Sequence, residues 1–175
     1  LASDESTFLS INPAVLADEL GEFPLSTRDD VHDAIAAART ALTGWAATPA
    51  PTRGQIIGNM GRLLMEYKDD LVRLQAREIG KTLKECGGEI QEAIDTCLFF
   101  QSEGRRLYGQ TVNSELPDQE LFTYRRPVGV CGIINACNFP SAVPFWKMIP
   151  AIICGNTCVS VSYTHLTLPT KTRGG

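Results

Sequence analysis

The sequence predicts an α/β fold in which several helices are followed by one strand–helix–strand unit of an incomplete parallel sheet. Two observations predict it. In the front part of the chain, apolar residues recur every three to four positions, which is typical of amphipathic helices. After Pro127 a continuous apolar run replaces that period, and every Asp and Glu of the 175 residues lies before it.

Composition excludes several classes of function. The chain carries 16 Lys and Arg against 20 Asp and Glu, so it lacks the basic surface that nucleic-acid binding requires. Apolar residues make up 43% and charged residues 21%, as in ordinary globular proteins. Asp4 and Glu5 stand where a secretory signal would be basic. We therefore expect a cytoplasmic protein with no nucleic-acid partner.

The first elements are a strand pair and a helix. We expect strands at Phe8–Ile11 and Gly21–Leu25, joined as a hairpin with a long loop. Ser26 is expected to cap the helix that follows, because two Asp residues occupy its first turn, where carboxylates favour the helix dipole. Its apolar face ends before Pro49.

Three further helices are predicted before any long strand. They cover Gln55–Tyr67, Asp69–Ile79 and Leu83–Leu107, and Gly80 is a plausible C-terminal cap of the second. The buried stripe predicted for the last helix consists of Leu83, Cys86, Ile90, Ala93 or Ile94, Cys97 and Leu98 or Phe100. Helices alone would also form a bundle, which is the alternative interpretation of this region.

The period then changes to that of strands. Gln110–Leu116 and Leu121–Arg126 are predicted to be exposed strands, and Val128–Ile134 a strand buried on both faces. A helix over Ala142–Cys154 and a strand from Thr157 complete the strand–helix–strand unit. The apolar end could also suggest a membrane span, but repeated Asn and Pro residues interrupt it, so a buried unit fits better.

The six cysteines do not predict a disulfide framework or a metal site. No CxxC motif occurs, and zinc needs four ligands at short paired spacings. We expect reduced, buried cysteines that act as small apolar residues in a cytosolic protein.

The turn after the predicted buried strand is the best candidate for chemistry. Ligands of parallel sheets bind at the carboxyl ends of strands, and Asn138 lies at such an end. Its amide could donate to an oxyanion or cap the following helix, and the spacing alone favours the cap. Gly129 and Gly132 lie inside the strand, so they form no dinucleotide fingerprint. Lys147 is expected to be a helix-surface lysine.

An ordered series of short motifs runs through the apolar end of the chain. The main motifs are Arg126-Pro127-Val128-Gly129-Val130, Gly132-Ile133-Ile134, Asn138-Phe139-Pro140, Trp146-Lys147, Pro150-Ala151 and Gly155-Asn156-Thr157. This series resembles the N-terminal half of the aldehyde dehydrogenase superfamily. Upstream motifs agree with it, and the resemblance covers roughly Leu9–Val159. The tracts 21–26 and 114–118 are similar to bacterial members that act on short semialdehydes.

The resemblance implies oxidation of an aldehyde to a carboxylic acid with NAD or NADP. In the family a cysteine thiolate attacks the aldehyde, hydride passes to the nicotinamide, and a glutamate activates water. Asn138 matches the family's oxyanion donor, which reverses the preference for a cap. Ile134, Ala136, Cys137 and Asn138 match cofactor-lining positions. The family usually has Pro-Trp in place of Ala136-Cys137, and this difference leaves the cofactor wall looser.

The family's nucleophile and general base match no residue of this chain, so we expect the chain alone to be inactive. By resemblance, residues 1–108 are the helical part of the cofactor-binding domain and residues 127–160 its first strand–helix–strand unit. Residues 109–126 begin the oligomerisation strands, which implies a homo-oligomer, dimer or tetramer. Residues 161–170 resemble a translated sequencing adapter, so residues 161–175 are expected to be a non-native tail.

Two other functions are compatible with these residues. A member of the superfamily that uses CoA in place of water as acyl acceptor would share them. A non-catalytic binding module, with the helices as a bundle and the apolar end as a docking segment, would also fit. In the leading interpretation the small-molecule partner is an aldehyde, and no membrane or metal is involved.

Overall fold

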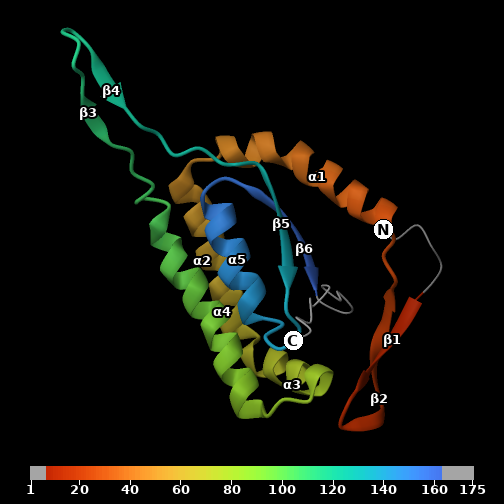
Figure 1. Ribbon diagram of the computed structural model, residues 1–175. Coiled ribbons are helices and arrows are strands. Elements are labelled where there is room, and N and C mark those ends of the chain that lie inside the picture. Colours follow the sequence, from red (N-terminus) through yellow and green to blue (C-terminus); the bar gives the residue numbers. More distant parts are fainter. Residues whose placement is uncertain (1–6, 163–175) are drawn as a thin grey trace, which may run out of the picture.

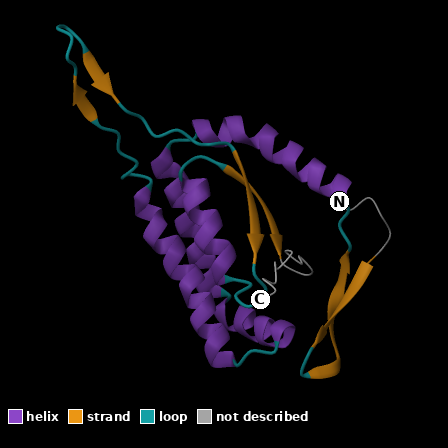
Figure 2. Cartoon of the chain, in the orientation of Figure 1, coloured by secondary structure: helices purple, strands orange, loops and turns teal. Residues whose placement is uncertain are grey.

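The computed structural model describes residues 7–162, which form an α/β arrangement of helices and small two-stranded sheets (Figures 1 and 2). The described strands are β1 (Thr7–Asn12), β2 (Val15–Pro24), β3 (Thr111–Asn113), β4 (Glu120–Phe122), β5 (Val130–Asn135) and β6 (Thr157–Ser162). The described helices are α1 (Arg28–Ala47), α2 (Ala50–Glu66), α3 (Lys68–Ile79), α4 (Leu83–Glu103) and α5 (Ala142–Ile153).

The first hairpin has a tight turn, and the predicted long loop is wrong. Strand β2 starts at Val15, which pairs with Asn12 across the turn. The Asn12 side-chain oxygen accepts a hydrogen bond from the amide of Ala14 at 2.9 Å. Such a side chain mimics a backbone turn, so Asn12-Pro13 reverses the chain at once and strand pairing follows immediately.

Helix α1 is capped by Thr27 and not by Ser26. The amide of Asp30 donates to the Thr27 hydroxyl at 3.4 Å, and the Thr27 amide donates to the Asp30 carboxylate at 2.7 Å. This reciprocal pair is a capping box. Ser26 and Asp29 are also three residues apart, so the local sequence would allow a capping box at either pair. In the structure the box forms between Thr27 and Asp30.

Helices α2 and α4 cross at very short range because glycines line the contact. A Cβ atom on Gly54 would overlap the backbone carbonyl of Gln101, and one on Gly58 would overlap the Gln101 side chain. Next to this crossing, α5 packs on both helices to complete the main core. The buried residues of that core are Ile57, Cys97, Ile149 and Ile153.

Two helix boundaries differ from the prediction. Helix α2 begins at Ala50 and not at Gln55, because Pro51 is tolerated in the first turn of a helix, where amides need no partner. Helix α4 ends at Glu103 and not at Leu107. Gly104, its C-cap, lies so close to the Ala50 carbonyl that a Cβ there would overlap it. Helix α4 therefore ends where it meets the first residue of α2.

Replacing Gly54 by Ala is expected to lower the free energy of unfolding by about 1–3 kcal/mol, because the added methyl group forces two packed backbones apart. Gly88→Ala in α4 is the control, since a Cβ there would meet nothing within 4 Å. That control is expected to be neutral or to stabilise by up to about 1 kcal/mol. Denaturant unfolding compares the two variants, and equal stability of both would contradict the close-crossing argument.

Strands β5 and β6 pair in parallel through α5, which confirms the predicted strand–helix–strand unit. The all-helical bundle is therefore wrong for this chain. Helices α1 and α5 lie on either side of this strand pair (Figure 1).

The expected burial of β5 on both faces is wrong, since Ile134 remains 55% exposed. A cavity of about 260 Å³ lies between α1 and the face of the strand pair that carries Ile134, so α1 does not cover this face of β5 fully.

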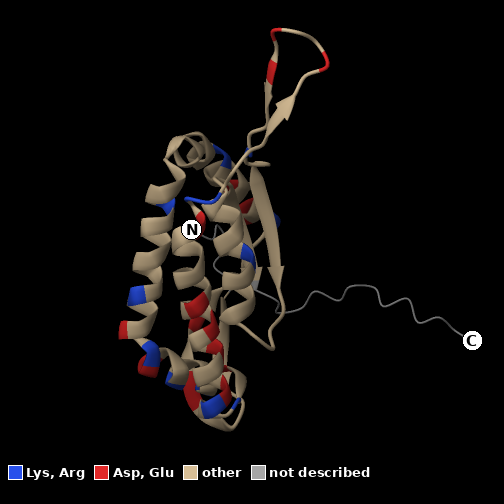
Figure 3. Ribbon diagram, turned by 90° about the vertical axis from the view of Figure 1, so that its left-hand side faces the viewer, with Lys and Arg blue, Asp and Glu red and all other residues tan. Residues whose placement is uncertain are grey.

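A second hairpin, β3–β4, projects away from the helices (Figure 1). Its strands are shorter than predicted but are exposed, as expected. Glu115, Asp118 and Glu120 make its outer end acidic (Figure 3). Phe122 is 52% exposed on β4. Within the described residues the two strands pack on each other and not on the helices.

Residues 163–175 lie outside the described part of the chain, and with them most of the expected tail. Val161 and Ser162 belong to β6, where they pair with Ile134 and Asn135. Over residues 7–162, no helix combines the length and the apolar character that crossing a membrane requires.

Candidate functional site

The residues selected from the sequence gather at the carboxyl end of β5. Ile134 lies on the strand, and Ala136, Cys137 and Asn138 follow it in an exposed turn. Asn138 is not the cap of α5, because that helix starts at Ala142 with Ser141 as its N-cap residue. The capping interpretation is therefore wrong, and the Asn138 side chain makes no hydrogen bond within residues 7–162.

The N-terminus of α5 is capped by a side chain from another helix. The Glu89 carboxylate, on α4, accepts hydrogen bonds from the amides of Ser141 at 2.8 Å and Ala142 at 3.3 Å. A carboxylate suits this position because helix amides and the helix dipole are positive there. Glu89 therefore fixes where α5 begins, directly after the turn that carries Asn138.

Glu89 is fully buried, and both of its oxygens are satisfied. Its second oxygen accepts from the Lys81 ammonium at 3.0 Å and from the Gln75 amide at 2.6 Å. The Ser141 hydroxyl in turn donates to the Gln75 side-chain oxygen at 2.6 Å. A buried carboxylate needs such a set of donors, since an unpaired buried charge is costly. We call Gln75, Lys81, Glu89 and Ser141 the corner network.

Lys81 links the corner network to the turn. Its ammonium donates to the backbone carbonyl of Asn138 at 2.5 Å and lies 3.9 Å from the centre of the Phe139 ring. The Phe139 ring stacks on Trp146, with centroids 6.2 Å apart. Two contacts of Lys81 thus connect the α3–α4 connection with Asn138 and Phe139, and the ring stacking joins Phe139 to α5.

Lys147 holds the other side of the turn. It is exposed on α5, as expected, and its ammonium donates to the Ile134 carbonyl at 2.7 Å. Asn135, between these anchors, is buried and donates from its side chain to the Ser160 hydroxyl at 2.8 Å. Its side-chain oxygen has no hydrogen-bond partner among the described residues.

The Asn156 side chain, in the sequence Gly155-Asn156-Thr157 that follows α5, makes three hydrogen bonds. Its side-chain oxygen accepts from the amides of Val128 at 2.7 Å and Gly129 at 3.0 Å. Its amide donates to the Ala151 carbonyl at 2.9 Å. One side chain therefore joins the start of β5 to the end of α5.

All six cysteines are free, but the expected burial is wrong for Cys137, which lies in the exposed turn after β5. Burial raises the pKa of the Cys97 and Cys158 thiols to about 11, so both are protonated at neutral pH. Cys137 is the exposed cysteine beside Asn138. In the part of the chain that is described, no three His, Cys, Asp or Glu residues come close enough together to hold a metal ion.

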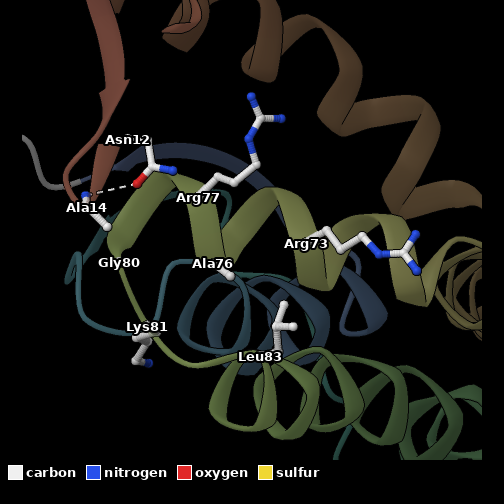
Figure 4. A pocket seen from close by; sticks show the side chains of 8 residues that line it. All are labelled: Asn12, Ala14, Arg73, Ala76, Arg77, Gly80, Lys81 and Leu83. Carbon is white, nitrogen blue, oxygen red and sulfur yellow. Dashed lines mark hydrogen bonds between the residues drawn. The ribbon is translucent and has the colours of Figure 1, made fainter. Parts of the chain in front are cut away.

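A pocket of about 350 Å³ lies between the first hairpin and α3 (Figure 4). Arg73, Arg77 and Lys81 line it, but each is paired within the chain. The hydrogen bonds from Arg77 lower the pKa of Asp18 to about 2 and fasten the hairpin to α3. Figure 4 shows the Lys81 side chain pointing away from both arginines. The cations of this pocket therefore serve the fold.

Sequence reasoning selected Asn138 as a candidate but gave no indication of the contacts of Glu89 and Lys81. One signal was present, since Glu89 lies three residues after Cys86 on the apolar stripe of α4. An acidic residue on a buried stripe needs partners. Its partners come from α3, from the α3–α4 connection and from the start of α5, and no local pattern indicates them.

The model of the aldehyde dehydrogenase family matches residues 1–166. An α-ketoglutarate semialdehyde dehydrogenase of Haloferax volcanii is 38% identical over 148 residues, which are 85% of this chain and 31% of that protein. The NADP-dependent succinate-semialdehyde dehydrogenase of Escherichia coli is 40% identical over 148 residues, 85% of this chain and 30% of that protein.

Solved structures agree in fold. An NADP-dependent enzyme of E. coli matches with a TM-score of 0.87 at 38% identity, over 91% of this chain and 33% of that one. A betaine aldehyde dehydrogenase of Staphylococcus aureus in complex with NAD⁺ matches with a TM-score of 0.87 at 28% identity, over 92% and 33%. The chain thus spans about a third of the length of its relatives. It belongs to the aldehyde dehydrogenase family and corresponds to the N-terminal part of that fold.

Proposed function

We propose that this chain is the N-terminal part of an NAD(P)-dependent aldehyde dehydrogenase that oxidises a short semialdehyde to a carboxylic acid. The observation that carries the proposal is the exposed Asn138 side chain at the carboxyl end of β5, with its backbone held by Lys81. The names of relatives, which include α-ketoglutarate, succinate and malonate semialdehyde dehydrogenases, support the substrate class.

Asn138 has the chemistry of an oxyanion donor. When a thiolate adds to an aldehyde, the carbonyl oxygen becomes negative and needs a hydrogen-bond donor already in place. The Asn138 amide can donate without breaking another hydrogen bond in the described chain. The thiolate and the general base would come from outside the segment that matches the relatives, so of these three catalytic groups the chain alone would supply only the oxyanion donor.

The cofactor-lining positions also fit their proposed role. Ile134 is 55% exposed, and the small side chains of Ala136 and Cys137 are exposed beside it. An open strand end of this kind can receive a flat ligand through apolar and backbone contacts. NAD or NADP bound there would accept the hydride, and these residues would line its binding site.

Other features support proposals for the assembly and the compartment of the protein. The exposed β3–β4 hairpin, within residues 109–126, supports a homo-oligomer in which this hairpin contacts a second subunit. The six free cysteines support a reducing, cytoplasmic location.

The test is to sequence the source DNA from codon 120 through codon 160 and beyond, and to express the reading frame found. We expect a frame that continues with family sequence in place of residues 161–175. Its product should reduce NAD or NADP when a semialdehyde is added, whereas the 175-residue chain should not. Assays with and without CoA distinguish the acylating alternative from hydrolysis.

Three outcomes would contradict the proposal. A stop codon directly after Gly175 in native DNA would favour the binding module. Aldehyde-dependent NAD reduction by the 175-residue chain would show that the nucleophile lies within it. A complete product that acts only when CoA is present would replace the hydrolytic reaction by the acylating one.

A further inference from the structure

We propose that Lys81 is a positioning residue, which aims the Asn138 side chain by holding the Asn138 backbone carbonyl. The inference rests on the proposed role of Asn138 as oxyanion donor. It adds a residue of the α3–α4 connection to a site whose other residues belong to β5 and the turn after it.

The turn depends on Lys81 because its own hydrogen bonds are few. Among residues 7–162, the bond from Lys81 is the only hydrogen bond made by Asn138. Lys147 holds the Ile134 carbonyl four residues earlier, and Glu89 holds the Ser141 amide three residues later. Within this segment Asn135 donates to Ser160 and the Phe139 carbonyl accepts from the Val143 amide, but only Lys81 makes a hydrogen bond to Asn138 in the described chain.

The position of Lys81 is itself fixed. Gly80 ends α3 in a left-handed conformation, with φ at 70°, and so turns the chain toward α4 at Lys81. The Lys81 ammonium then binds the buried Glu89 carboxylate, which also caps α5. The Glu89 carboxylate therefore fixes both the residue at which α5 begins and the position of the Lys81 ammonium that binds the Asn138 carbonyl.

Lys81 acts through Asn138 and not on the substrate. Its ammonium is occupied by the Glu89 carboxylate, the Asn138 carbonyl and the Phe139 ring. Loss of these contacts frees the peptide unit that carries the Asn138 side chain. A misplacement of about 1 Å at a reacting group can lower a rate by about 10²-fold, so a measurable loss is expected.

The test uses the complete dehydrogenase with Lys81→Met. We expect kcat to fall by about 10- to 100-fold with little change in KM, because donation to the oxyanion counts mainly in the transition state. Lys81→Arg keeps the charge and should recover part of the loss. Lys68→Met is the matched control, since Lys68 joins α3 to α4 through Gln91 at 2.6 Å without contact to the turn. That control should leave kcat unchanged.

A double-mutant cycle with Asn138→Ala identifies the route of the effect. If Lys81 acts through Asn138, Lys81→Met should lower kcat less than about threefold when Asn138 is already Ala. An undiminished loss in that background would overturn the proposal. If Lys81→Met folds poorly because the buried Glu89 carboxylate has lost its partner, the double variant Lys81→Met/Glu89→Gln replaces it in the kinetic test. The glutamine is neutral and keeps a side-chain oxygen that accepts from the α5 amides.

A spectroscopic measurement separates this inference from the proposed function. The Phe139 amide shares its peptide unit with the Asn138 carbonyl, so its nitrogen chemical shift should change in Lys81→Met and not in Lys68→Met. If the shift changes but Asn138→Ala leaves kcat intact, the proposed function fails and the anchoring by Lys81 stands. No change in the shift would overturn the anchoring itself.

Discussion

Replacing Asn138 by Ala in the complete dehydrogenase is expected to lower kcat by about 10²–10³-fold, which corresponds to roughly 2.7–4 kcal/mol of transition-state stabilisation. The Asn138 amide is exposed at the end of β5 and free of other hydrogen bonds in the described chain, so Ala removes the donor and little else. Steady-state kinetics with a semialdehyde and NAD or NADP measure the effect. The thermal midpoint should stay within a few degrees of the wild type.

Asn59→Ala is the matched control for this change. Asn59 is also an exposed asparagine, but it lies on α2 and accepts a hydrogen bond from Arg62 at 2.8 Å. It is far from β5 in the sequence and makes no hydrogen bond to a site residue in the described chain. Kinetic losses of equal size in both variants, or no loss in Asn138→Ala, would rule out Asn138 as the oxyanion donor.

Replacing Glu89 by Ala should cause the largest loss of stability, roughly 3–5 kcal/mol, as expected when one partner of a buried ion pair is removed. The change leaves the Lys81 ammonium, the Gln75 amide and two amides at the start of α5 without their acceptor. Urea unfolding followed by circular dichroism measures the loss. Hydrogen exchange should locate it in α5 and in the turn before that helix.

Glu89→Gln is the control that separates the effect of losing the negative charge from the effect of losing the whole side chain. Glutamine keeps an oxygen that can accept from the α5 amides, but it has no charge to pair with Lys81. Its loss should therefore be smaller than that of Glu89→Ala. If Glu89→Ala unfolds at the same urea concentration as the wild type, the corner network contributes nothing measurable and its assigned role is wrong.

Local patterns predicted much of the fold. The apolar stripe of α4, the change of period near residue 110 and the apolar run after Pro127 predicted the order of helices and strands. Gly80 was identified as the end of α3, and its φ of 70° confirms this, because a left-handed residue at a helix end is a local requirement. Such features depend on neighbours in the sequence and can be recognised there.

Errors arose where two local solutions were equally good or where distant segments met. Ser26 and Thr27 each have an Asp three residues later, so only the packed structure distinguishes Thr27 as the cap of α1. Burial of β5 was overestimated because an apolar run does not show whether its outer face is covered. Ile134 remains exposed beside the cavity under α1.

The sequence by itself determined the family, the strand–helix–strand unit and Asn138 as the candidate donor, because short motifs and periodicity carry that information. Only the tertiary structure decided how that donor is held. Glu89 caps a helix that begins more than 50 residues later, and Lys81 reaches the Asn138 carbonyl across 57 residues. Such contacts form when α3, α4 and α5 pack together, and a buried charge then takes whichever donors the packing brings near it.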